Sequence, residues 1–164
     1  MTDYARANVR QHNHTQSQIT DLSAAGITQS AADARYSALA HTHTTTRAIE
    51  FIIDGGGATI TTGVKGDLEI PYAATITAAR LFADQSGSIV VNVWKDTYAN
   101  FAPTVADKIT ASAPPTISSA SKSQDTTLTG WTTSISAGDI LRFNVDSVTT
   151  IQRVTLSLTV TITV

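Results

Sequence analysis

The sequence predicts a mainly β protein, in which a C-terminal antiparallel β-sandwich of jelly-roll type follows an N-terminal, extended or short-helical stem. Composition gives the first reason, since the 164 residues include 28 Thr and 15 Ser but 2 Glu and 4 Lys. Thr is β-branched and favours strands, whereas Glu and Lys favour helices. The second reason is a series of short apolar runs beyond residue 46, separated by turn residues roughly every 8–15 positions. The third is that residues 1–46 carry few large apolar side chains.

The predicted stem, residues 1–46, is polar and cannot bury a core of its own. Residues 17–22 and 30–40 fit short helices, and Ser30 followed by Asp33 matches an N-terminal capping pattern. The longer of the two helices presents only a thin apolar stripe. Such a segment either packs against copies of itself or stays partly disordered.

Residues 47–164 are predicted to form the head domain, and its elements follow in order along the chain. The expected strands cover residues 47–54, 58–62, 67–70, 74–84, 88–96, 116–121, 127–136, 139–148 and 151–164. Residues 85–87 and 137–139 are expected turns, and residues 97–115 contain Pro and an expected short helix at 104–110. Strands this short with no helix between them favour an antiparallel sandwich, with a single closed barrel as the alternative.

The last run alternates along its whole length and is the strongest strand signal. One face carries only apolar side chains: Val154, Leu156, Leu158, Val160, Ile162 and Val164. The other face is Thr and Ser, which neither charge nor block a sheet edge. We therefore expect a central strand, or a strand that pairs with a neighbouring subunit.

Charge and composition exclude several classes of function. The formal net charge of -2 argues against a broadly basic nucleic-acid-binding surface. The absence of Cys excludes disulfide frameworks, thiolate zinc sites and cysteine nucleophiles. No apolar run approaches the ~20 residues of a membrane helix, and the N-terminus lacks the apolar core of a signal peptide. We expect no nucleic-acid partner, no membrane insertion and no signal peptide.

Catalytic motifs are not evident in the sequence. The glycines at 55–57 precede an expected strand rather than a helix, so they indicate a tight turn rather than a phosphate-binding loop. Glu50 and Glu69 are the only glutamates, and most Asp residues stand in turns. A Ser-His-Asp site would have to draw its His from the stem. We therefore expect the protein not to be an enzyme.

Two His-x-His-Thr motifs are the sharpest local feature of the chain. They place the candidate metal ligands at His12, His14, His41 and His43. Residues i and i+2 of an extended chain point to the same side, so three parallel chains would bring six imidazoles to one axis. Six nitrogen donors suit an octahedral ion such as iron(II), nickel or cobalt, whereas zinc prefers four ligands. The alternatives are solvated loop histidines, a formal glycosylation sequon at Asn13, and an H-N-H nuclease whose remaining motif is missing here.

Two other kinds of ligand remain open at this stage. Calcium is not excluded at the rim of a jelly roll, although no dense Asp-x-Asp loop supports it. Tyr98 and Phe101, in an irregular segment with Asn and Pro, are the candidate receptor-binding aromatics. Trp94 and Trp131 are expected in the core instead. The polar stretches 84–86 and 122–125 are expected turns that could face a ligand, with plain solvation as the default.

Part of the sequence resembles the stems of tail fibres and spikes of tailed bacteriophages. The stretches that carry the resemblance are HNHTQSQITDL (12–22), ADARY (32–36) and HTHT (41–44). In that family, His-x-His pairs from three subunits hold an iron ion on the trimer axis. The resemblance therefore implies a homotrimer in which the four histidines named above bind iron.

The second region is similar to a module found near the C-terminus of many phage tail and fibre proteins. The matching segments are residues 52–72, 76–96 and 136–148. The resemblance implies a virion protein, made in the host cytoplasm, whose N-terminal segment attaches to other virion proteins. Most fibres are far longer than this chain, so tail and capsid positions both stay open.

The resulting hypothesis is a homotrimeric structural protein of the phage virion, acting as a tail-fibre or tail-tip adhesin. It would bind a glycan or protein of the host surface without catalysis. The alternative is a capsid decoration, head-fibre or tail connector protein whose role is assembly or stability.

Overall fold

The described part of the chain is residues 43–163 of a computed structural model. The expected stem helices, and the candidate ligands His12, His14 and His41, lie outside these residues. The strands are β1 (Thr44–Asp54), β2 (Gly63–Ile70), β3 (Ala74–Thr97), β4 (Thr116–Asp125), β5 (Ser134–Ile135), β6 (Asp139–Thr149) and β7 (Arg153–Thr163). In this region the helical elements are two single 3-10 turns, η2 (Tyr98–Asn100) and η3 (Val105–Asp107).

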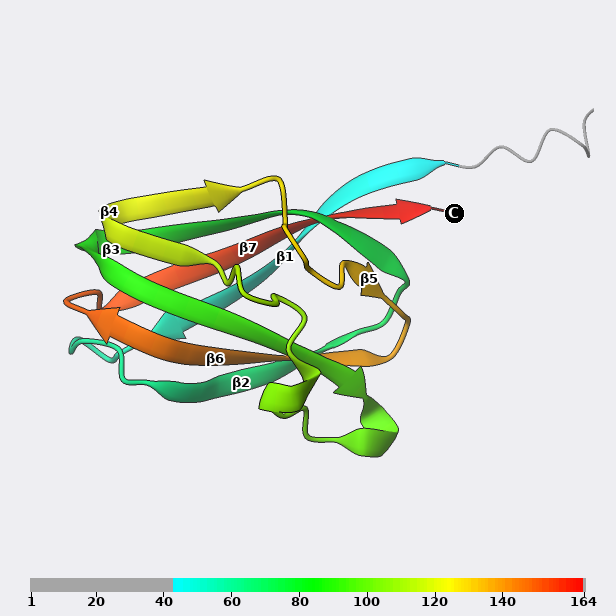
Figure 1. The fold of residues 1–164 in the computed structure, drawn as a ribbon, viewed down its shortest axis with the longest axis horizontal. Helices are drawn as coiled ribbons and strands as arrows, with labels where there is room; N and C mark the ends of the chain where they lie inside the picture. Colours follow the sequence, from blue (N-terminus) through cyan, green and yellow to red (C-terminus); the bar gives the residue numbers. More distant parts are fainter. Residues whose placement is uncertain (1–42, 164) are drawn as a thin grey trace, which may run out of the picture. The chain divides into compact units, whose positions relative to one another are not determined.

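All seven strands belong to one antiparallel sheet, which confirms the prediction of a mainly β, antiparallel fold. Their order is β1-β7-β3-β6-β2, with β4 and β5 also paired to β3. The long strand β3 pairs with β7 along Thr75–Ala83 and with β6 along Ser88–Thr97. The sheet curls in consequence, and Figure 1 shows β3 reversing its course at one end of the domain.

The chain reverses direction at residues 85–87, where a turn is expected, but the two expected strands on either side are one strand, because β3 continues through the bend (Figure 1). Gly87 lies so close to the β6–β7 connection that an added Cβ would be 2.4 Å from Thr150 Oγ1 and 2.5 Å from the Thr149 oxygen. Thr150 Oγ1 also donates a hydrogen bond to the Ser86 oxygen at 3.0 Å. Tertiary contacts therefore hold the bend in place at the residues where the sequence predicts a turn.

Two further strand predictions are wrong in extent. Residues 58–62, although alternating, form a loop whose Ile60 is buried and donates its amide to the Ile151 oxygen at 2.9 Å. The stretch 127–136 contributes only the two residues of β5. In both places an apolar side chain fills the interior of the curled sheet without its backbone joining the sheet.

The final strand confirms the expectation of a central strand, since β7 lies between β1 and β3. Most of its apolar face is covered: Val154, Leu156, Leu158 and Val160 are each 0% exposed, whereas Ile162 is partly buried. Burying a side chain of this size contributes about 1.5–3 kcal/mol. The strand is therefore a main contributor to the core, together with the inward-facing residues of β3 and β6.

Aromatic side chains add to the core in two places. The rings of Phe51 and Phe143 stack with centroids 4.1 Å apart. Trp131 is 9% exposed, and its Nε1 donates to the Ala113 oxygen at 2.9 Å, as expected for a core Trp. Trp94 is only partly buried and does not belong to the core cluster. No helix within residues 43–163 is long and apolar enough to cross a membrane.

Candidate functional site

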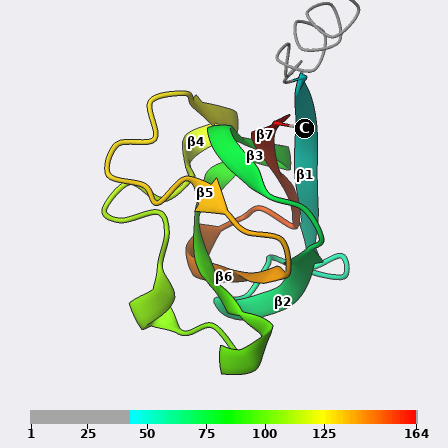
Figure 2. The same ribbon diagram turned by 90° about the vertical axis from the view of Figure 1, so that its right-hand side faces the viewer.

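The segment that follows β3 carries three of the six large apolar side chains that are exposed within residues 43–163. Tyr98, Phe101 and Val105 are 78%, 58% and 65% exposed. They stand on or beside the turns η2 and η3, and we call residues 98–107 the aromatic loop. Figures 1 and 2 show this loop projecting from the end of β3, on the side of the domain away from β4.

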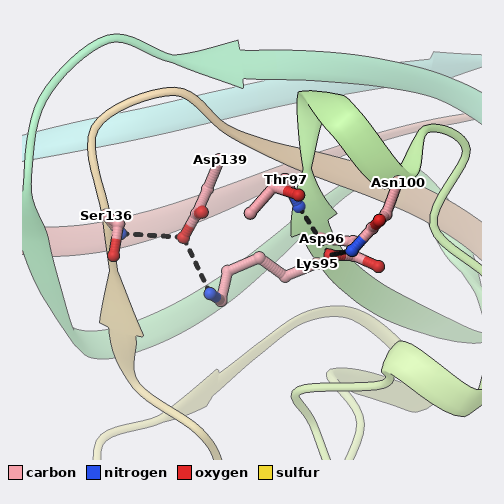
Figure 3. Close-up of polar contacts among 6 residues, drawn as sticks. All are labelled: Lys95, Asp96, Thr97, Asn100, Ser136 and Asp139. Carbon is pink, nitrogen blue, oxygen red and sulfur yellow. Dashed lines mark hydrogen bonds and ion pairs between the residues drawn. The ribbon is translucent and has the colours of Figure 1, made fainter.

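The first half of the aromatic loop is fixed by the carboxylate of Asp96. Its Oδ1 accepts hydrogen bonds from the Thr97 amide at 2.7 Å and from Asn100 Nδ2 at 3.1 Å (Figure 3). The bond from Thr97 and then that from Asn100 favour the charged form, so they lower the pKa of Asp96. The Phe101 amide closes the turn on the Tyr98 oxygen at 3.2 Å.

A capping box fixes the second half of the loop. Thr104 Oγ1 accepts from the Ala106 amide at 3.3 Å, and the Thr104 amide donates to Asp107 Oδ2 at 2.7 Å. These reciprocal bonds occupy donors that a short turn otherwise leaves open. Exposed apolar side chains therefore stand here on an ordered backbone.

Arg142 of β6 contacts the aromatic loop and restricts its position. Its Nε and Nη2 donate to the two carboxylate oxygens of Asp67 at 2.6 and 2.8 Å, and its Nη1 donates to the Pro103 oxygen at 3.3 Å. Its guanidinium carbon lies 5.4 Å from the centroid of the Phe101 ring, within cation–π range. The hydrogen bond to Asp67 raises the pKa of Arg142. One side of the Phe101 ring is thus engaged by the protein.

An ion pair next to the loop anchors the start of β6, three residues before Arg142. Lys95 Nζ lies 2.7 Å from Asp139 Oδ2, which also accepts from the Ser136 amide at 2.8 Å (Figure 3). Asp139 is 3% exposed, so its charge depends on these partners. The pair ties the β5–β6 turn to the end of β3, from which the aromatic loop departs. These groups hold structure and are not aimed at an open space.

The predicted site residues fall into two groups. Tyr98 and Phe101 lie on one loop and are exposed, as a receptor-binding role requires. His43 is exposed just before β1, whereas the other three candidate ligands lie outside the described residues. Across residues 43–163, no three His, Asp or Glu side chains lie close enough together to hold a metal ion.

The polar stretches 84–86 and 122–125, both expected to be turns, differ in the structure. Asp84 Oδ1 accepts from the Gln152 and Arg153 amides at 3.2 and 3.1 Å, so residues 84–86 serve the bend of β3 rather than a ligand. Residues 122–125 are not a turn, because they form the second half of β4.

Sequence reasoning missed Arg142, Asp67 and Val105 as parts of the loop site. Strand alternation puts Arg142 on the outer face of β6, but no local signal connects it to a loop some forty positions earlier. Chemically, the site offers apolar contact area and hydrogen-bonding groups on a fixed backbone. Comparisons of the chain with protein-family models and with curated proteins find no match.

Proposed function

We propose that this protein is a homotrimeric structural protein of a tailed-phage virion that acts as a tail-fibre or tail-tip adhesin. It binds a receptor on the host surface, a glycan in the first instance, and does so without catalysis. The observation that carries the proposal is the aromatic loop, in which Tyr98 and Phe101 are exposed on a hydrogen-bonded backbone.

Ordered, exposed aromatic residues favour recognition for a thermodynamic reason. Tyr and Phe offer a large contact area with few rotatable bonds, so little conformational entropy is lost on binding. Asp96, Thr104 and Arg142 already restrict the loop before any ligand arrives. Aromatic faces also match the apolar faces of sugar rings.

The proposed trimer rests on the stem residues rather than on the head. His12, His14, His41 and His43 form two His-x-His pairs per chain, and three chains would supply six imidazoles at each level. We assign iron to these levels, on the resemblance to phage fibre stems. The N-terminal segment is the attachment to other virion proteins.

A jelly-roll-like sandwich is the finer fold that we propose for the head. Support comes from the pairing of β3, whose two halves join β7 and β6 in turn. Apolar side chains from both halves, such as Leu81 and Val93, are 0% exposed. This pattern suits a sheet folded over a shared interior.

Virion labelling and adsorption test the adhesin proposal. Labelled antibody against the protein is expected at the tail tip, and soluble protein is expected to block adsorption of the phage. The double substitution Tyr98→Ala and Phe101→Ala should abolish the block. The matched control is Ile52→Ala, since Ile52 is 62% exposed on β1, outside the aromatic loop. Uniform label on the capsid would favour the decoration alternative, and release of reducing sugar from host polysaccharide would indicate an enzyme.

Sedimentation and elemental analysis test the stem. The full chain should sediment at three times its mass of 17.3 kDa. It should carry about one or two metal ions per trimer, because each His-x-His level supplies one octahedral set. His12→Ala and His41→Ala should each remove metal. A stable monomer contradicts the trimer, and metal-free protein straight from purification contradicts the metal assignment.

A further inference from the structure

A pocket of about 180 Å³ opens beside β4, and none of the residues that line it belongs to the aromatic loop. One wall is the start of β4 with the residues before it, Pro114, Pro115 and Thr116. The other wall is the end of the same strand, Ser123, Gln124 and Asp125. The first half of β4 pairs with β3 after its bend and the second half before it, so the two walls face each other across the curl of the sheet. We call this space the seam pocket.

Two polar side chains of the seam pocket point toward the concave side of the sheet. Ser123 pairs with Leu81, and Asp125 pairs with Ala79. Residues directly opposite each other in an antiparallel pair share a face. Leu81 and Ala79 are 0% and 2% exposed. A hydroxyl and a carboxylate therefore occupy half-buried, interior-facing positions at the edge of the sheet.

The proline wall is preformed, because its carbonyl groups are engaged elsewhere. The Pro115 oxygen accepts from the Val91 amide at 3.0 Å. The Pro114 oxygen accepts from Thr116 Oγ1 at 2.8 Å. This wall consequently offers a ligand the apolar faces of the two pyrrolidine rings, with the second lone pair of the Thr116 hydroxyl beside them.

The strand wall is also fixed, yet it retains hydrogen-bonding capacity. Asp125 Oδ1 accepts from the Thr127 and Leu128 amides at 2.8 and 3.1 Å. Gln124 Oε1 accepts from Arg80 Nε at 2.8 Å. Within the described residues, the Ser123 hydroxyl, Gln124 Nε2 and Asp125 Oδ2 make no side-chain hydrogen bond. Ser123 and Asp125 share the interior-facing side of β4, whereas Gln124 pairs with Arg80 on the other face. The wall thus presents to the pocket a hydroxyl, which can donate and accept, and a carboxylate acceptor.

This set of groups defines the class of ligand. A mixture of donors and acceptors suits hydroxyl groups, which both donate and accept. The lining includes one carboxylate and no Lys or Arg, so it disfavours anions. The volume is below the ~300 Å³ at which sites for drug-sized ligands begin. One small ring with several hydroxyl groups is the ligand that fits.

We propose that the seam pocket binds a single uncharged sugar residue at the end of a glycan. The preference for a sugar over other neutral polyols rests on the proposed adhesin function. The pocket would fix the position of the glycan end through Ser123 and Asp125. The aromatic loop would then provide a separate contact area.

An NMR titration of the full-length protein with glucose, galactose and mannose tests the pocket directly. At least one of these sugars should give saturable shifts of the backbone amides at residues 113, 116 and 123–125. Ser123→Ala and Asp125→Asn should each weaken that binding about tenfold, as for loss of one charge-assisted or shared hydrogen bond. The Asn oxygen still accepts from Thr127 and Leu128, so the second variant keeps the turn. Ser121→Ala, exposed on β4 outside the pocket, is the matched control and should bind as the parent does.

The outcomes separate the two proposals. Absence of saturable shifts in the pocket at sugar concentrations on the order of 100 mM overturns the seam site. Shifts confined to the aromatic loop also overturn it, while leaving the adhesin function intact. Sugar binding in the pocket by a protein that neither blocks adsorption nor labels the tail supports the seam site and contradicts the adhesin function.

Discussion

The guanidinium carbon of Arg142 lies 5.4 Å from the centroid of the Phe101 ring, while its nitrogens hold both carboxylate oxygens of Asp67. The Asp67 carboxylate therefore fixes the position of the guanidinium group next to the Phe101 ring. This link joins β2, β6 and the aromatic loop, which are far apart in sequence. The orientation of an exposed Phe thus depends on a strand residue that lies far from it in the sequence.

Arg142→Lys should loosen the aromatic loop without unfolding the domain. Lys cannot form the two-pronged bond to Asp67 and stack on Phe101 at once, so we expect a loss of about 1 kcal/mol of local stability. Hydrogen exchange at the Phe101 and Asp107 amides should accelerate. Arg153→Lys, which alters another Arg–Asp pair at 2.6 Å, is the control and should leave these amides unchanged. Equal acceleration in both variants would contradict the local role of Arg142.

Lys95→Met should destabilise the whole domain. The substitution leaves Asp139 charged in a site where its side chain is 5% exposed. Removing one partner of a buried pair costs about 3–5 kcal/mol. Because the Lys95 side chain is 18% exposed and solvent screens part of its charge, we expect about 2–3 kcal/mol.

Urea unfolding measures this loss, and a second substitution identifies its cause. Adding Asp139→Asn to Lys95→Met should restore part of the stability, because the uncompensated charge is then gone. If the double variant is less stable than the single one, the loss comes from packing rather than from the charge.

Gly87→Ala should destabilise the domain. Its Cβ would lie 2.4 Å from Thr150 Oγ1 and 2.7 Å from Ile151 Cγ1, and Ile151 is 0% exposed. Relief of such overlap requires the β6–β7 connection to move, at a cost of at least about 1–3 kcal/mol. Thermal unfolding followed by circular dichroism measures the loss. Ser86→Ala, at the exposed neighbour, should stay within about 0.5 kcal/mol of the parent.

Acid should weaken the domain in part through Asp54. Arg153 donates to its carboxylate at 2.6 Å and the Gly56 amide donates at 2.7 Å, and these bonds lower the pKa of Asp54. A lowered native pKa means that the contribution is complete above the unfolded value, about 3.9, and disappears as the pH falls through the native value. The unfolding free energy should therefore decline below about pH 4.

Asp54→Asn and Arg153→Gln should each flatten this decline, since the first removes the titrating carboxyl group and the second removes the largest cause of its lowered pKa. Urea unfolding between roughly pH 2 and pH 5 measures the slope. An unchanged slope in both variants would show that Asp54 titrates alike in the folded and unfolded chain.

Local pattern in the sequence predicts the regular parts of the fold. The alternation of Val154, Leu156 and Leu158 predicts a central strand, and β7 is one. Alternation fails at residues 58–62, because Ile60 is buried by a loop that folds over the core. It fails again at Gly87, where close contact with Thr149 and Thr150, residues distant in the sequence, keeps β3 continuous through the bend.

The candidate sites are likewise only partly predictable from the sequence. Aromatic residues amid Asn and Pro predict an exposed loop at Tyr98 and Phe101, and the structure confirms their exposure. The support from Arg142 arises only once β6 lies beneath the loop. The polar residues 122–125 are predicted from the sequence to be a turn that could face a ligand. Only the curl of β3 brings them opposite Pro114 and Pro115.

The pairing of Thr44 with Thr163 has a practical consequence for protein engineering. A polypeptide enters β1 and leaves β7 at adjacent points, one strand spacing of about 4.8 Å apart. The domain can therefore be inserted into a surface hairpin of a carrier protein without distorting the domain or the hairpin. The same adjacency permits circular permutation, in which a short linker joins the two strands and new ends are cut at the exposed Thr61–Thr62 loop.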